Sequence, residues 1–259
     1  MGERKGAARG AWIGAALASA GVVSAAWAAD AARRAQGGRH LHRTLVELLL
    51  NALTVDEPAT ARHSRRVADL AFALARARGM GRRARATLRV AALLHDLGKI
   101  DDRFFHILHS RRRLSARERA EIEFHPEQSA RILEPLESLH PGIQRIVASH
   151  HERWDGSGYP AGTAGEKIPL ASRIISLADA FDAVTQPRGY SEPVPAAKAL
   201  GMLRRGAGKQ FDPELVRLLD APALREEWGG IARKGLADER RHLADPSPTE
   251  APLERQPAQ

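Results

Sequence analysis

Residues 86–99 read "ATLRVAALLHDLGK". Apolar residues recur in this stretch at the spacing of a helix, and Gly98 is a residue type that commonly ends one. His95 and Asp96 therefore lie at the end of a predicted helix. An adjacent histidine and aspartate can both bind a metal ion there, although the pair alone would favour a surface position beside a glycine stop.

The same helical pattern recurs on both sides of this stretch. Further helices are predicted over residues 41–53, 63–77, 142–151, 169–184 and 211–220, and from Ser115 onward. Ser115 and Glu118 fit a capping box, and Asp212 followed by Pro213 fits a helix start. Since no alternating strand pairs are apparent, the predicted fold class is all-α, with a compact helical bundle over residues 40–220.

Composition narrows the chemistry that the chain can perform. The 259 residues include no cysteine, so disulfides and thiolate metal sites are excluded and any metal must be held by His, Asp and Glu. The formal net charge is +9. Aromatic residues do not interleave with the arginines as they do in a groove for single-stranded nucleic acid, so a solvated arginine-rich surface is favoured over nucleic-acid binding.

Residues 11–29 read "AWIGAALASAGVVSAAWAA" and contain no charged residue. As a helix they would span roughly 28 Å, close to the thickness of a bilayer core. Trp12 and Trp27 lie near the two ends, where interfacial aromatic residues occur. The segment predicts a transmembrane helix, with a cleaved signal peptide as the alternative. It follows a short basic N-terminus (1–10) and precedes a linker (30–39).

The C-terminal residues 221–259 are charged and end in "DPSPTEAPLERQPAQ". This composition predicts a disordered tail.

Further potential ligands are distributed over successive predicted helices. They are His63, His125, His150, His151 and Asp179. Each alone has an ordinary explanation, such as a helix cap, a surface histidine or an arginine-paired aspartate. Asp179 lies within the apolar stretch "IISLADAFDAV", where a buried carboxylate needs a partner. Together with His95 and Asp96, these residues are sufficient for two metal ions.

The order of these residues resembles the HD-GYP family, the bacterial branch of the HD phosphohydrolases that degrades cyclic di-GMP. The resemblance covers roughly residues 40–220. It is carried by "HDLGK" (95–99), by the intact block "HHERWDGSGYP" (150–160), and by the histidines and aspartate around them.

The resemblance implies a binuclear centre of two divalent transition-metal ions, Fe or Mn. One ion would be held by His63, His95, Asp96 and Asp179, and the second by Asp96, His125, His150 and His151. A hydroxide shared by the ions would attack the phosphodiester and yield linear pGpG, with GMP as a further product. His95, Asp96 and Lys99 would be catalytic, and the substrate would be bound by Lys99, Arg188, Gly158, Tyr159 and Pro160.

Location and partners follow from the same resemblance. Because cyclic di-GMP is cytoplasmic, residues 11–29 would be an uncleaved single-pass anchor in the inner membrane, with the catalytic domain in the cytoplasm. Diguanylate cyclase (GGDEF) proteins would be partners, through the Gly-Tyr-Pro loop, and a homodimer is a further option.

Two positions depart from the family pattern. Ala59 stands where some members have a glutamate that binds a third metal, so a two-metal site and pGpG as product are expected. Ser191 replaces a basic residue in "QPRGYS" (186–191), which removes one phosphate contact. Two alternatives stay open: a weakly active or inactive module that binds nucleotide or a cyclase partner, and an HD phosphohydrolase that acts on another cyclic nucleotide.

Overall fold

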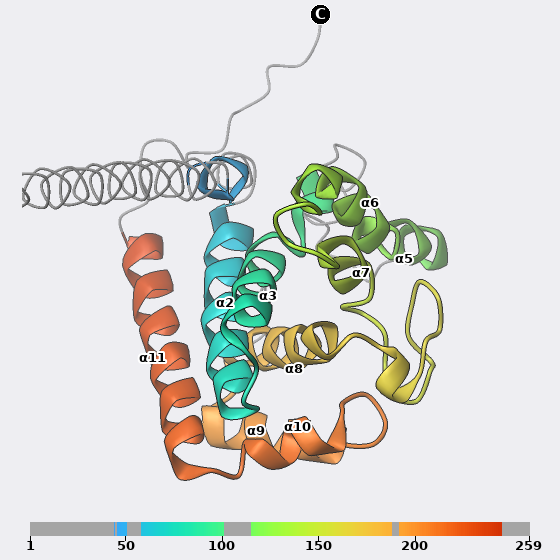
Figure 1. Ribbon diagram of the computed structural model, residues 1–259. Helices are drawn as coiled ribbons and strands as arrows, with labels where there is room; N and C mark the ends of the chain where they lie inside the picture. The colour runs from blue at the N-terminus through green and yellow to red at the C-terminus, as the bar shows by residue number, and fades with distance from the viewer. Residues whose placement is uncertain (1–43, 45, 51–57, 101–114, 188–191, 245–259) are drawn as a thin grey trace, which may run out of the picture. The chain divides into compact units, whose positions relative to one another are not determined.

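The computed structural model describes residues 44, 46–50, 58–100, 115–187 and 192–244. The chain divides into two units, residues 1–48 and 49–259. All of the elements discussed below belong to the second unit (Figure 1).

The described part of this unit is built from α-helices and short 3-10 helices. In chain order they are α2 (Pro58–Ala77), α3 (Arg82–Leu94), η1 (Leu97–Ile100), α5 (Ala116–Ile122), α6 (His125–Ile132), η2 (Glu134–Leu136), α7 (Ile143–Ala148), η3 (Gly165–Lys167), α8 (Leu170–Thr185), α9 (Ala196–Arg205), α10 (Pro213–Leu218) and α11 (Pro222–Ala244). Within the described residues the only β-structure is an isolated bridge between Ala207 and Phe211. The predicted all-α class is confirmed, while the predicted N-terminal hydrophobic helix lies outside the described residues.

Helix α2 is the centre of the unit, because α3, α8 and α11 all pack against it (Figure 1). Its apolar face is fully buried, as shown by Leu70 and Leu74, and Phe181 of α8 lies in the same core. On the other side of α3, α6 packs against η1 and α7. These contacts bring the C-terminal ends of α3 and α7 close to the N-terminal end of α6.

A glycine fixes how closely α6 approaches η1. A Cβ atom on Gly98 would lie 2.5 Å from the backbone oxygen of His125 and 2.7 Å from the backbone nitrogen of Ser129. The backbone of Gly98 also donates a hydrogen bond to Ser129 Oγ at 2.8 Å. Gly98 therefore sets the position of His125, the first residue of α6.

The C-terminal segment corrects the sequence prediction. Residues 221–259 were predicted to be a disordered tail, but residues 222–244 form α11. Leu224, Trp228 and Ala232 repeat every four residues along it and are buried, which overrides the charged composition between them. The Trp228 ring packs on Phe181 with centroids 4.8 Å apart, and its Nε1 donates to the carbonyl of Leu70 at 3.2 Å. Residues 245–259 lie outside the described part.

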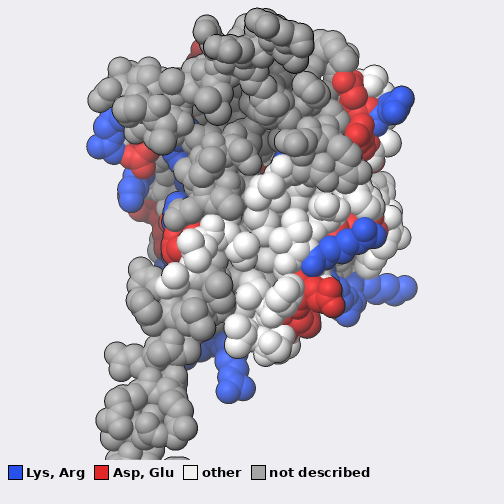
Figure 2. All heavy atoms as spheres, turned by 90° about the horizontal axis from the view of Figure 1, so that it is seen from above, with Lys and Arg blue, Asp and Glu red and all other residues white. Residues whose placement is uncertain are grey.

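Several exposed charged side chains in the described part of the chain form ion pairs. The exposed pairs include Arg76–Glu227 at 2.6 Å, Arg89–Asp69 at 3.2 Å and Arg204–Asp220 at 2.7 Å. In Figure 2, basic and acidic side chains adjoin one another at the edges of the described surface. Uncharged residues occupy the middle of that surface. This pattern agrees with the predicted solvated arginine-rich surface.

The predicted single-pass placement in the inner membrane is corrected. Among the described residues, no helix combines the length and the apolar character needed to cross a bilayer. The two longest described helices, α2 and α11, each contain several arginines and at least one acidic residue. Residues 11–29, on which the prediction depended, lie outside the described residues.

Candidate metal centre

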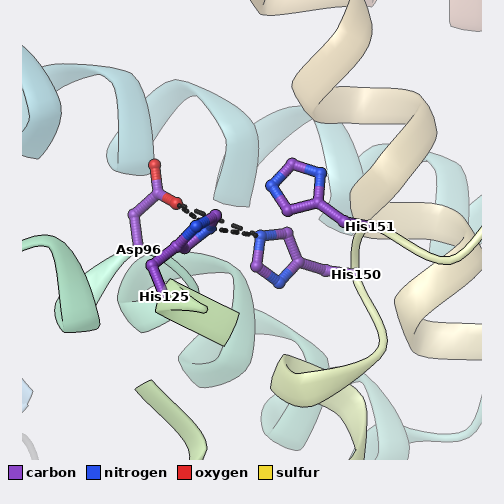
Figure 3. A group of neighbouring side chains, drawn as sticks. All are labelled: Asp96, His125, His150 and His151. Carbon is purple, nitrogen blue, oxygen red and sulfur yellow. Dashed lines mark hydrogen bonds and ion pairs between the residues drawn. The ribbon is translucent and has the colours of Figure 1, made fainter. Parts of the chain in front are cut away.

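The fold brings together all seven residues that the sequence predicts as ligands. His63 lies on α2, His95 caps the C-terminus of α3 and Asp96 follows it, His125 begins α6, His150 and His151 follow α7, and Asp179 lies on α8. They form two groups, and within each group the potential ligand atoms all lie within 4.8 Å of one another. The first contains His63, His95 and Asp179, and the second contains Asp96, His125, His150 and His151 (Figure 3).

Asp96 joins the two groups through its separate carboxylate oxygens. Its Oδ1 lies 3.2 Å from Nε2 of His125 and 3.9 Å from Nε2 of His150. Its Oδ2 lies 3.5 Å from Nε2 of His95 and 4.0 Å from Nε2 of His63. Each oxygen therefore faces a different group, which is the arrangement that a bridging carboxylate needs.

Backbone hydrogen bonds fix the orientation of three of the histidine rings. His95, His125 and His150 each place Nδ1 at 2.9, 2.6 and 2.6 Å, respectively, from the carbonyl three residues earlier, those of Ala92, Ile122 and Val147. A carbonyl oxygen can only accept, so Nδ1 is the donor in each case. With the Nδ1 hydrogen directed to the backbone, each ring in its neutral form presents the lone pair of Nε2 to the centre, as metal ligation requires.

The polar atoms at the centre fit a bound cation. Nε2 of His125 lies 3.3 Å from Nε2 of His150, so two lone pairs face each other. Among the described residues, His95 Nε2 and Asp96 Oδ1 are buried without a hydrogen-bond partner. Buried polar atoms of this kind are costly unless they are paired. Imidazole nitrogens with carboxylate oxygens are a donor set for divalent transition metals.

The protonation states also suit metal binding. Burial, helped by neighbouring histidines, lowers the pKa of His150 far below its ordinary value, and burial lowers the pKa of His151 to about 3. Burial likewise lowers the pKa of His95. Burial opposes ionisation of Asp96, but His95 and Lys99 outweigh it and hold the pKa of that carboxyl well below its usual range. Neutral imidazoles and an ionised carboxylate are the forms that bind metals.

The loop after His151 is held against the centre by a buried acid. Glu152, only 3% exposed, accepts hydrogen bonds from the backbone N–H of Ala161 at 2.8 Å and of Thr163 at 2.9 Å. It therefore supports the loop. Asp155 acts similarly and accepts from the backbone of Ser157 at 3.1 Å.

The predicted substrate residues Gly158, Tyr159 and Pro160 lie in this loop, next to the second group. A Cβ on Gly158 would be 2.6 Å from the carbonyl oxygen of His151, so the loop can double back only with glycine there. The Tyr159 ring stacks on His151 with centroids 4.9 Å apart. A cis peptide bond joins Tyr159 to Pro160.

The remaining predicted residues have different outcomes. Lys99 Nζ lies 2.7 Å from Asp96 Oδ2, so its ammonium group borders the centre. Ala59 is exposed in the first turn of α2. Arg188 and Ser191 lie outside the described residues.

Sequence reasoning missed Asp182. Its Oδ2 lies 2.7 Å from Nδ1 of His63, on the opposite side of the ring from Asp179, whose Oδ1 is 3.2 Å from Nε2. The signal that could have identified it is its spacing, because residues three apart on a helix share a face. Burial opposes protonation of His63, but hydrogen bonds to the two aspartates outweigh it and raise the pKa of that imidazole.

Comparison with known proteins agrees with this geometry. A family model described as "HD domain" matches residues 47–215. A Vibrio cholerae protein named 3'3'-cGAMP-specific phosphodiesterase 2 is 36% identical over 184 residues, which is 70% of this chain and 35% of that protein. A Thermotoga maritima cyclic di-GMP phosphodiesterase is 38% identical over 161 residues, 61% of this chain and 43% of that protein. The chain thus spans less than half the length of these relatives.

Among solved structures, a cyclic GMP-AMP specific phosphodiesterase of V. cholerae superposes with a TM-score of 0.53. The match covers 74% of this chain and 53% of that one at 20% sequence identity. At this identity the likeness concerns the fold.

Proposed function

The chain belongs to the HD-GYP family of the HD-domain superfamily, and from this premise we propose that it is a metal-dependent phosphodiesterase that hydrolyses cyclic di-GMP to linear pGpG. The observation that carries the proposal is the placement of Asp96, whose two oxygens face two separate histidine groups. A bridging carboxylate of this kind supports two ions close enough to act on one phosphate.

In the proposed site the first ion would be held by His63, His95 and Asp179 together with Asp96, and the second by Asp96, His125, His150 and His151. When bound, two divalent ions, Fe or Mn, supply activation of a water molecule and neutralisation of phosphate charge. The hydrogen bonds from Nδ1 to backbone carbonyls hold the rings in place, so little reorganisation accompanies binding.

Substrate contacts are proposed for the groups that border the ligands. Lys99 carries a positive charge 2.7 Å from Asp96 and could donate to a non-bridging phosphate oxygen instead. Gly158, Tyr159 and Pro160 form the adjacent wall, with Tyr159 supported by His151. Arg188 is proposed as a second phosphate contact from the sequence alone. Docking to GGDEF proteins and homodimer formation stay predictions.

The proposal is tested by incubating the purified full chain with cyclic di-GMP and Mn²⁺ or Fe²⁺ and separating the nucleotides. We expect linear pGpG, and no product from a variant carrying His95→Ala with Asp96→Ala that keeps its helical circular dichroism. Asp220→Asn, which removes an exposed ion pair with Arg204, is the control and should react like the unaltered chain. Failure to form linear dinucleotide or GMP with any divalent metal would exclude the proposed activity.

A second candidate substrate is 3'3'-cGAMP, because a relative that is 36% identical is named for that specificity. Measuring kcat/KM for both cyclic dinucleotides in the same preparation decides between them. A higher value for cyclic di-GMP supports the first proposal, and a higher value for 3'3'-cGAMP replaces it with the second.

A further inference from the structure

The two histidines of the first group, His63 and His95, differ in what their Nδ1 atoms contact. Nδ1 of His63 lies 2.7 Å from Asp182 Oδ2, whereas Nδ1 of His95 bonds to a backbone carbonyl. Asp182 is 1% exposed and lies on α8, one helical turn after Asp179. The ring of His63 is therefore held between two aspartates of the same helix, one on each nitrogen.

Arg66 holds both carboxylate oxygens of Asp182. Its Nε donates to Asp182 Oδ1 at 2.7 Å and one Nη donates to Oδ2 at 3.1 Å. Such a two-pronged contact restricts the carboxylate in position and in plane. Burial opposes ionisation of Asp182, but its contacts with His63 and then Arg66 outweigh it and lower the pKa of that carboxyl. The ionised carboxylate can only accept, so His63 donates its Nδ1 proton.

Helix α11 in turn holds Arg66. Glu239 Oε1 lies 3.2 Å from Nη1 of Arg66 and 3.1 Å from Nε of Arg62. Close approach of α11 at this point depends on Gly235, because a Cβ there would lie 2.5 Å from Cδ of Arg66. The matched family region ends at residue 215, so α11 lies beyond it.

We propose that Asp182 is a positioning residue for the first metal group, and that Arg66 and Glu239 hold it in place, which makes α11 part of the support of the metal centre. The proposal rests on the metal-binding function proposed above. A carboxylate on the far nitrogen of a histidine ligand fixes its tautomer and ring orientation, and it strengthens the ligand. Asp182 does this for His63 without touching substrate.

The test measures Mn²⁺ binding to the full chain by competition with a chromophoric chelator. Asp182→Ala should weaken binding of one of two ions by roughly 10–100-fold, the effect usual for the loss of such a partner. The other ion, held by the group without His63, should bind as before. Asp182→Asn keeps an oxygen that can accept but loses the charge, so it should restore part of the affinity and serves if the alanine variant does not fold.

Two matched controls separate positioning from general stability. Asp212 is also buried and paired with an arginine, Arg173, but caps α10 away from the centre. Asp212→Ala should lower stability and leave both Mn²⁺ affinities unchanged. Glu239→Gln should weaken the same ion as Asp182→Ala, although less. Glu227→Gln removes the ion pair between Glu227 of α11 and Arg76 of α2. It should leave the affinity for both ions unchanged.

A second readout does not depend on metal or activity. At a pH above the raised pKa of His63, nitrogen-15 NMR of the metal-free chain should show the neutral ring protonated at Nδ1, and Asp182→Ala should move part of that proton to Nε2. This shift supports the positioning role even if no phosphodiester is hydrolysed. Unchanged ion affinity together with an unchanged tautomer in Asp182→Ala would overturn the proposal, as would an equal loss of affinity in Asp212→Ala.

Discussion

Asp96 differs from the other ligands because each of its oxygens faces a different histidine group. The sequence could predict the candidate ligands because their order along the chain resembles that of the HD-GYP family, and the fold brings these residues together. It could not predict which nitrogen of each ring carries the proton, because that depends on carbonyls such as that of Val147, whose direction only the fold sets. Asp182 was missed although its spacing of three residues from Asp179 places both on one face of α8.

The special place of Asp96 gives a prediction at the scale of single residues. Asp96→Asn replaces one carboxylate oxygen by a donor group, so both ions should bind more weakly. The loss should exceed the roughly 10–100-fold effect of removing a hydrogen-bond partner behind a ligand. His125→Ala should weaken only the second ion. Elemental analysis of the purified variants measures this, and loss of a single ion from Asp96→Asn would contradict the bridging role.

At the scale of elements, the centre depends on close contact between η1 and α6 rather than on the ligands alone. Helical spacing predicted most of the helices, but the approach of two elements depends on atoms that no periodicity reports. Gly98 illustrates this, since its missing Cβ allows the backbone of His125 to lie against it.

Gly98→Ala should therefore destabilise the fold by about 1–3 kcal/mol through overpacking and shift His125 away from Asp96. Urea unfolding gives the stability, and Mn²⁺ affinity at the second group should fall with it. Gly81→Ala is the matched control because a Cβ there meets no atom within 4 Å, and it should change stability by less than about 0.5 kcal/mol. Equal effects of the two substitutions would rule out the contact as the cause.

Helix α11 was the main error of the sequence prediction at this scale. Its composition is charged, yet the four-residue repeat of Leu224, Trp228 and Ala232 buries one face on α2. Composition averages over a segment and hides such a narrow stripe.

Trp228→Ala should accordingly cost about 3–5 kcal/mol of unfolding free energy, because it empties a fully buried site. Circular dichroism during urea unfolding measures it. Met202→Ala, at a residue 36% exposed, is the comparison and should stay within about 0.5 kcal/mol of the unaltered chain. A midpoint for Trp228→Ala equal to that of Met202→Ala would show that α11 does not stabilise the unit.

At the scale of the whole molecule, the motif order predicted the family and the helical spacing predicted the all-α class. The family is confirmed, and the described residues confirm the class. Short signature blocks succeed because a metal centre demands particular residues in a particular order along the chain. The predicted membrane placement is corrected, because none of the described helices is able to span a bilayer. Residues 11–29 lie outside the described residues.

The central claim is that this unit binds two ions through one shared carboxylate and needs both to cleave a cyclic dinucleotide. Titration of the metal-free full chain with Mn²⁺, with bound metal and hydrolysis of cyclic di-GMP followed together, tests it most directly. The account predicts two ions per chain, no hydrolysis after chelation, and activity that returns only as the second ion binds. Saturation at one ion, or full hydrolysis by the chelated protein, would contradict it.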